Sequence, residues 1–265
     1  MGGASAYLKV GLAYYHGKGV PKDYKEAMKC FLNAAEQGNA SAQLLLAKMY
    51  FEGRGVARNY SEVIKWNRMA AEQGKVKAQM FLGDVYLVGE EVAQNYSEAM
   101  KWHKMAAEQG IADSQFKVSA MYHAGQGVAQ NYSEAMKWGR KAAEQGNSDS
   151  QTLIGGMYLG GRGVTKDYKE AAKYFRKAAE QGHKSAQFYL GSMYEQGGGV
   201  TQNSSESMKW YKMAAEQGDA EAQFKVGAMY CTGRGVALDT EEALKWIRKA
   251  AEQGYERAQK ILETL

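Results

Sequence analysis

The chain has 265 residues, of which 24% are charged and 45% are hydrophobic, with 34 Lys and Arg against 29 Asp and Glu. This composition excludes a disordered chain, and no run of about 18 apolar residues predicts a membrane-spanning helix. The net charge of +5 is too small to indicate a nucleic-acid partner, and two cysteines cannot form a disulfide scaffold.

One pentapeptide, Ala-Ala-Glu-Gln-Gly, recurs seven times at a constant spacing of 36 residues. A fixed period of this length is typical of stacked structural repeats, each too small to bury its apolar face alone. The positions of each repeat are numbered from 1 to 36. The repeats are residues 3–38, 39–74, 75–110, 111–146, 147–182, 183–218 and 219–254.

The first half of each repeat has the apolar periodicity of a helix, here called helix A. In residues 39–74 the apolar face contains Ala42, Leu46 and Met49, spaced three and four apart. Position 9 is always small, which predicts close approach of a neighbouring helix. Gly53 and Gly55 are expected to end the helix with positive φ. The third repeat has Glu91 in place of the second glycine, so its loop is expected to differ.

The second half of each repeat predicts another helix, helix B, which begins at a capping box. Asp or Asn is followed three residues later by Glu in every repeat, as in Asn59 and Glu62. We expect the Asn to cap the helix and the Glu to bond back to the backbone N–H of the Asn. Helix B ends at the glycine of the pentapeptide, which is the usual residue just after a helix.

All five tryptophans occupy position 28, on the apolar side of helix B: Trp66, Trp102, Trp138, Trp210 and Trp246. Apolar neighbours favour core packing over a stacking platform for sugars or bases. Residues 255–265 start an eighth helix A in which Lys260 and Glu263 replace apolar and small residues, as expected of a C-terminal cap. The first repeat has no such cap.

The repeat A-x-A-Q-x-x-L-G-x-M-Y-x-x-G-x-G-V-x-x-[DN]-Y-x-E-A-x-K-W-x-x-x-A-A-E-Q-G resembles the Sel1-like repeat, a relative of the tetratricopeptide repeat. The resemblance implies an all-α fold, a right-handed α-α superhelix of antiparallel helix pairs, forming one solenoid over residues 1–265. It also implies scaffold or adaptor work through protein contacts. A subfamily with a disulfide in each repeat is linked to β-lactam binding and hydrolysis. This chain has only Cys30 and Cys231, in repeats one and seven, so it departs from that subfamily.

Residues with catalytic potential have simpler explanations. The four histidines fall at four different repeat positions, whereas a metal site needs converging ligands. Ser114 and Lys117 match the Ser-x-x-Lys motif of penicillin-recognising enzymes, but Ser114 is this repeat's small helix A residue and the companion motifs are missing. Glycosylation sequons coincide with the helix B caps. We therefore expect no catalytic residue, cofactor or metal.

A partner is expected to bind where helix A varies between repeats, on the face that related repeats make concave. Position 13 is mostly large and apolar, although polar residues also occur there, which indicates a binding groove. An equally weighted alternative is that these side chains pack against helix B of the next repeat. Position 10 becomes small from Ala120 onward. The predicted partner-binding residues are Tyr15, Lys48, Phe51, Asp84, Leu87, His123, Leu159, Tyr189 and Glu195.

The sequence thus predicts a non-catalytic scaffold that binds a protein or peptide, with no nucleic-acid partner and no membrane insertion. The alternatives are a β-lactam-hydrolysing enzyme and a binder of cell-envelope glycans. A monomer is expected, with an end-to-end dimer through the uncapped first repeat as the alternative. The first residues lack the regions of a signal peptide, which leaves a cytoplasmic protein, or a periplasmic or secreted one whose signal was removed.

Overall fold

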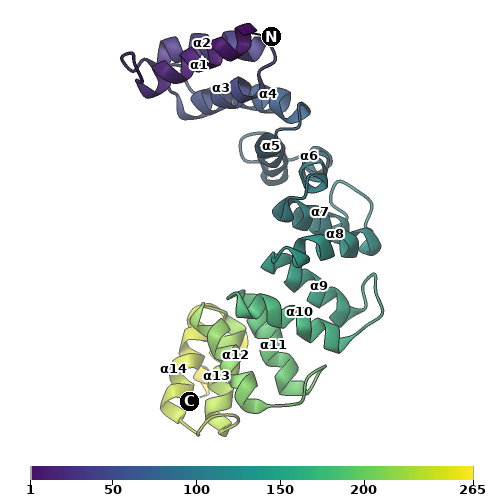
Figure 1. The fold of residues 1–265 in the computed structure, drawn as a ribbon. Helices are drawn as coiled ribbons and strands as arrows, with labels where there is room; N and C mark the ends of the chain where they lie inside the picture. The colour runs from purple at the N-terminus through teal and green to yellow at the C-terminus, as the bar shows by residue number, and fades with distance from the viewer. Residues whose placement is uncertain (1, 265) are drawn as a thin grey trace. The chain divides into compact units, whose positions relative to one another are not determined.

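A computed structural model describes residues 2–264, which form fifteen helices and no strands (Figure 1). Two compact units meet between Gln130 and Asn131. The first unit contains α1 (Gly2–His16), α2 (Tyr24–Glu36), α3 (Ala40–Glu52), α4 (Tyr60–Glu72), α5 (Val76–Val88), α6 (Tyr96–Glu108) and α7 (Ala112–Ala124). The second contains α8 (Tyr132–Glu144), α9 (Ser148–Gly160), α10 (Tyr168–Glu180), α11 (Lys184–Gln196), α12 (Ser204–Glu216), α13 (Ala220–Thr232), α14 (Thr240–Glu252) and α15 (Glu256–Glu263).

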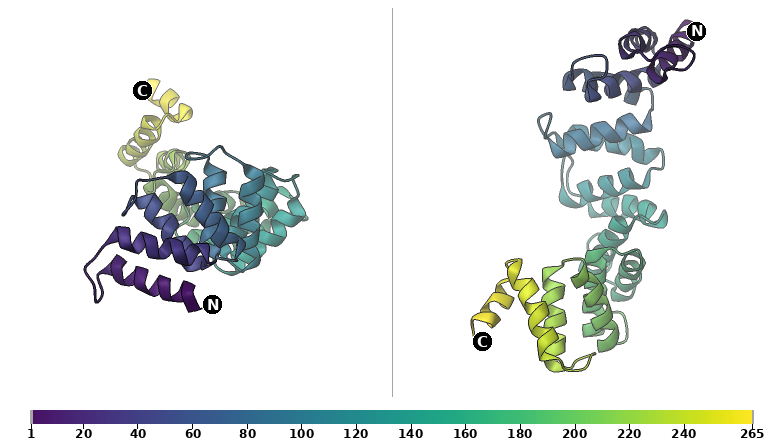
Figure 2. Two further views of the ribbon diagram at one scale, coloured as in Figure 1. Left: turned by 90° about the horizontal axis from the view of Figure 1, so that it is seen from above. Right: turned by 90° about the vertical axis from the view of Figure 1, so that its left-hand side faces the viewer.

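Within each unit, every helix packs against the helix before it and the helix after it in sequence (Figure 2). The odd-numbered helices are the predicted A helices and the even-numbered ones the predicted B helices. The all-α repeat fold is therefore confirmed. Helix α15 follows the seventh repeat, with Ala258 buried against α14 and with Lys260 and Glu263 exposed; its role as a cap stays a prediction.

The helix B caps confirm half of the predicted capping box. The cap side chain accepts the backbone N–H of the Glu three residues later, at 2.9–3.2 Å in all seven repeats. The reciprocal bond was predicted wrongly. The N–H of Asn59, for example, donates instead to the carbonyl of Tyr50 in helix A, at 3.2 Å. The Glu carboxylates are therefore free to pair with a Lys three residues later or, as in Glu98, to accept from a Trp indole N–H.

In the five repeats that have a glycine at position 9, this glycine faces a large residue at position 29 of the same repeat. A Cβ placed on Gly83 would lie 2.6 Å from the ring of His103, and one on Gly155 would lie 2.9 Å from the ring of Phe175. Such distances are well inside van der Waals contact. Glycine is therefore required at these positions because a bulky side chain of helix B packs directly on the backbone of helix A.

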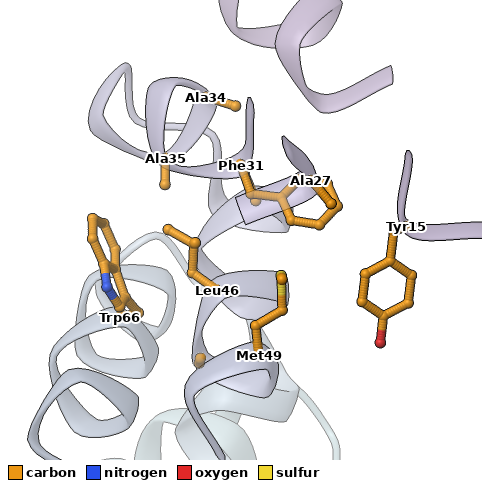
Figure 3. Close-up of a cluster of buried hydrophobic side chains, with 10 residues drawn as sticks. Tyr15, Ala27, Phe31, Ala34, Ala35, Leu46, Met49 and Trp66 are labelled. Atoms are coloured by element: carbon orange, nitrogen blue, oxygen red, sulfur yellow. The ribbon is translucent and has the colours of Figure 1, made fainter. Parts of the chain in front are cut away.

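The tryptophan row lies in the core, as expected. All five indoles are buried, and Trp66, Trp102, Trp210 and Trp246 share core clusters with residues of the preceding helix B. Figure 3 shows this arrangement in the first unit, where Trp66 of α4 lies with Leu46 and Met49 of α3 and with Phe31 of α2. A stacking platform of exposed indoles is thereby excluded.

A ladder of glutamine pairs connects the repeats. The buried Gln79 donates its amide N–H to the carbonyl of Ala71, in the preceding helix B, at 3.0 Å. The side-chain oxygen of Gln79 accepts from Gln109, the glutamine of its own pentapeptide, at 2.7 Å. The same pairing recurs for Gln43, Gln151, Gln187 and Gln223. This explains why both glutamines recur in the repeat.

Candidate functional site

A hollow on the A-helix face of the first unit, here called hollow 1, has a volume of about 430 Å³. Its walls are mainly apolar. The lining residues are Leu44, Ala47, Lys48 and Phe51 of α3, Val63 and Asn67 of α4, and Lys77 and Phe81 of α5. Phe51 is 46% exposed although it is aromatic.

Hollow 1 exists because position 29 is short in the second repeat. Asn67 stands where five other repeats place a Phe, Tyr, Ile or His and the fourth repeat has Gly139. Its amide nitrogen donates to the carbonyl of Val63, one turn earlier, at 2.9 Å. Its amide oxygen accepts no hydrogen bond from residues 2–264, and it is not sealed from solvent. The site therefore offers one hydrogen-bond acceptor among apolar walls.

A second hollow of about 220 Å³, hollow 2, adjoins the first because Phe81 lines both. Its lining residues are Tyr60, Phe81, Asp84, Val85, Val88, Glu90 and Glu91. The ring of Tyr60 connects the two hollows, with its centroid 6.5 Å from those of both Phe51 and Phe81. Hollows 1 and 2 together are called the groove.

The exceptional Glu91 explains hollow 2. At this position Gly55 has a φ of +72°, and a Cβ there would lie 2.5 Å from the carbonyl oxygen of Tyr24, at the start of the preceding helix B. Among the described residues only glycines have positive φ, so Glu91 adopts a different backbone conformation. A side chain at position 17 cannot make the close approach to the preceding helix. The expected local difference in this loop is therefore confirmed.

The two ends of the groove carry opposite charges. Lys48 and Lys77 line hollow 1, whereas Asp84, Glu90 and Glu91 line hollow 2. Asp84 is engaged within the protein: its Oδ1 lies 2.6 Å from Lys117 Nζ and 3.3 Å from His103 Nε2. Partial burial alone would raise the pKa of Asp84, but the nearby His103 ring and the hydrogen-bonded Lys117 ammonium hold that pKa below its ordinary value.

The second unit has its own hollow on the A-helix face, hollow 3, of about 320 Å³. Two of its aromatic side chains, Tyr168 and Tyr189, are at least 40% exposed. The lining residues are Leu159, Tyr168, Phe188, Tyr189, Ser192, Met193, Gln196, Gly198, Glu221 and Lys225.

The residue at position 16 of the next repeat decides whether position 13 is covered. Arg54 covers Tyr15, with a 2.9 Å hydrogen bond to the tyrosine hydroxyl. Arg234 likewise lies against Glu195. Phe51 and Leu159 have Glu90 and Gly198 at that place instead, and both lie in hollows.

Comparison with known proteins supports the repeat assignment. The sequence model of the Sel1 repeat matches residues 4–39, 40–75, 76–111, 112–147, 148–183, 184–219 and 220–255. The chain belongs to the Sel1 repeat family. A search of curated proteins found no match.

Two solved structures of Sel1 repeat proteins are similar over nearly the whole chain. One is a protective antigen of uropathogenic Escherichia coli strains, with 40% identity and a TM-score of 0.84, covering 97% of this chain and 55% of that one. The other is a Sel1 repeat protein from Oxalobacter formigenes, with 34% identity and a TM-score of 0.77, covering 98% and 75%. The chain thus spans about half the length of the E. coli antigen.

The structure separates the predicted site residues of this Sel1 repeat protein into three groups. The first group lines a hollow: Lys48 and Phe51 in hollow 1, Asp84 in hollow 2, and Leu159 and Tyr189 in hollow 3. Five of the nine predicted residues therefore line a hollow. Lys48 and Phe51 share hollow 1, Leu159 and Tyr189 share hollow 3, and Asp84 lines hollow 2, which adjoins hollow 1. They remain predictions as binding residues.

Tyr15 and Glu195 make contacts between repeats instead. Tyr15 is only 6% exposed, which leaves its ring inaccessible to a partner. Glu195 pairs with Lys225 and Arg234 and accepts from the buried Tyr211 hydroxyl at 2.8 Å. Leu87 and His123 are half-buried and line none of the three hollows.

The sequence reasoning missed the helix B residues of the groove. Asn67 and Tyr60 lie on the second helix, which was expected to serve the core alone. Lys77 and Phe81 are on helix A, at positions 3 and 7, and were not among the predicted binding residues. The feature of the sequence that could have located the groove was Glu91, which replaces the glycine found at position 17 of the other six repeats.

The remaining motifs have structural roles. Ser114 is fully buried, and the ammonium group of Lys117 is held by Asp84 and Asp113, so this pair offers no accessible nucleophile. Both cysteines are free. No helix within residues 2–264 combines the length and apolarity that crossing a membrane requires. The end-to-end dimer stays a prediction; the outer face of α1, with exposed Tyr7 and Val10, is the surface it would use.

Proposed function

We propose that this Sel1 repeat protein is a non-catalytic scaffold that binds a protein or peptide on its A-helix face, and that the groove of the first unit is its principal site. The family fold is commonly a protein-interaction scaffold. The observation that carries the proposal is Phe51, an aromatic side chain left 46% exposed in an apolar hollow. Leaving such a side chain in water forgoes hydrophobic stabilisation that a partner would recover by covering it.

The groove also fits the requirements of a binding hot spot. Aromatic anchors surrounded by apolar walls supply most of the energy in known interfaces. Phe51, Tyr60 and Phe81 form such a set, and polar groups stand at the rim. Hollow 3, with Tyr168 and Tyr189, is a second contact area of the same kind.

The test is selection of a phage-displayed random peptide library on the immobilised protein. The variant Phe51→Ser removes the aromatic anchor, and Leu238→Ser is the matched control, because Leu238 is 64% exposed on a loop outside the three hollows. Far-UV circular dichroism establishes that both variants are folded. We expect peptides that bind the wild type and the control but lose at least tenfold in affinity for Phe51→Ser. Enriched peptides that bind all three proteins equally would refute the groove as the principal site.

A further inference from the structure

We propose that the groove selects an extended peptide segment with a fixed order of charges: an acidic residue beside Lys48 and Lys77, apolar residues in the two hollows, and a basic residue beside Glu90 and Glu91. This inference rests on the proposed function and adds the chemistry of the partner. No segment within residues 2–264 covers the groove, since Phe51 remains exposed there and Tyr60 and Phe81 are only half-buried.

The positive end is available to a ligand. Lys77 forms no ion pair with any described residue. Lys48 is more than half exposed, and its only carboxylate neighbour within reach, Glu52, is 4.0 Å away and also 3.0 Å from Arg54. Arg58 adds to the positive charge here, because its guanidinium lies 5.6 Å from the centre of the Phe51 ring. A carboxylate of the partner would therefore be attracted to this end.

The negative end is available for the same reason. Glu90 and Glu91 are exposed and form no ion pair with any residue that the structure describes. Asp84 does not contribute much, because Lys117 and His103 already engage it. Glu90 and Glu91 occupy positions where other repeats have residues such as Arg54 and Gly55, so this negative end occurs only where the second and third repeats adjoin.

The amide oxygen of Asn67 indicates that the occupant is a polypeptide rather than an apolar ligand such as a fatty acyl chain. It is an unsatisfied acceptor in the wall of hollow 1. A peptide backbone offers N–H donors at every residue, whereas an acyl chain offers none and would leave this oxygen desolvated at a cost. Main-chain bonding to an amide and side chains in adjoining hollows fit one extended segment.

The experiment sequences the peptides enriched on the wild type and then measures two synthetic probes by fluorescence polarisation: the most enriched peptide, and the same peptide with its acidic and basic residues exchanged. The quadruple variant Lys48→Glu, Lys77→Glu, Glu90→Lys and Glu91→Lys reverses the charges at the two ends of the groove. An exposed charge pair changes affinity by about threefold, so two pairs give a preference of about tenfold. We expect the wild type to prefer the first probe, the quadruple variant to prefer the second, and added salt to weaken both preferences.

The outcomes separate the two proposals. Enriched peptides that depend on Phe51 but show no charge order, or probes that both proteins bind equally, would overturn the charge-order inference and leave the scaffold proposal standing. If no enriched peptide depends on Phe51, both proposals fail for this groove. Preference for the exchanged probe by the wild type would also overturn the inference.

Discussion

Two adjacent glycines of α9 permit a direct test of how the helices of one repeat pack. Gly155 faces the ring of Phe175, and an ideal Cβ on it would lie 2.9 Å from two ring carbons. Gly156 is next to it on the same helix, and a Cβ there would meet nothing within 4 Å. The substitutions Gly155→Ala and Gly156→Ala therefore share their effect on helix propensity and differ in packing.

The magnitude follows from the geometry. Carbon atoms in contact prefer about 3.5–4.0 Å, so Phe175 or the backbone of α9 must move by about 0.6 Å or more. Phe175 is fully buried among Ala186, Leu190 and Met193 and has no free space to enter. Overpacking of this kind costs about 1–3 kcal/mol. The gain from replacing a helical glycine by alanine, about 1 kcal/mol, applies to both variants.

We expect Gly156→Ala to be slightly more stable than the wild type and Gly155→Ala to be less stable than Gly156→Ala by about 1–3 kcal/mol. Urea unfolding followed by far-UV circular dichroism measures this, with equal m values as the condition for comparing midpoints. Adding Phe175→Leu to Gly155→Ala should recover most of the loss, giving a coupling energy of about 1 kcal/mol or more. Equal stability of the two alanine variants would refute the assignment of position 9 as the contact for position 29.

Three further predictions concern other parts of the repeats. Gln79→Leu should destabilise the protein by about 1–3 kcal/mol, because it removes two buried inter-helix hydrogen bonds, one donated to the Ala71 carbonyl and one accepted from the Gln109 amide; urea unfolding measures this. Asn67→Leu should fill part of hollow 1, raising stability by about 0.5–2 kcal/mol and weakening the enriched peptides in fluorescence polarisation. Glu195→Gln should lower the free energy of unfolding at neutral pH and make that free energy fall less steeply as the pH is lowered. Partial burial would raise the pKa of Glu195, but hydrogen bonds from Lys225 and Tyr211 hold it below its ordinary value. The contribution of the Glu195 carboxylate to stability is therefore complete above its unfolded-state pKa of about 4.5 and is lost as the pH falls through its lower folded-state pKa.

Each of these has a control in the same chain. Gln259 occupies the repeat position of Gln79 but is exposed, so Gln259→Leu should cost little, and equal losses would contradict the ladder. Unchanged peptide binding in Asn67→Leu would show that the ligand does not use hollow 1. If urea unfolding shows that the free energies of unfolding of the wild type and of Glu195→Gln fall in parallel as the pH is lowered, the role given to that carboxylate is contradicted.

Local features were accessible from the sequence because they depend on residues close together in the chain. Asn59 and Glu62 predict a helix start, since a cap needs only one turn of backbone. The apolar spacing around Trp66 predicts its burial, because one face of a helix must be covered. These rules, repeated seven times, were enough for the all-α repeat fold, the helix pairs and the C-terminal helix.

The proposed binding surface depends on side chains that meet across repeats, and there the sequence alone was insufficient. Tyr15 and Phe51 occupy the same position and look equally suited to a groove, but Arg54 covers the first and Glu90 leaves the second open. Each covering residue is 39 positions further along the chain, so the contact becomes visible only when two repeats are placed together.

The sequence by itself determined where each helix begins and ends and which of its faces is buried, because caps, glycines and apolar spacing act within one repeat. Only the tertiary structure decided which places stay uncovered. A hollow arises where neighbouring side chains fail to fill a space, as at Asn67 and Glu91, and that depends on the combined volumes of residues from two helices or two repeats.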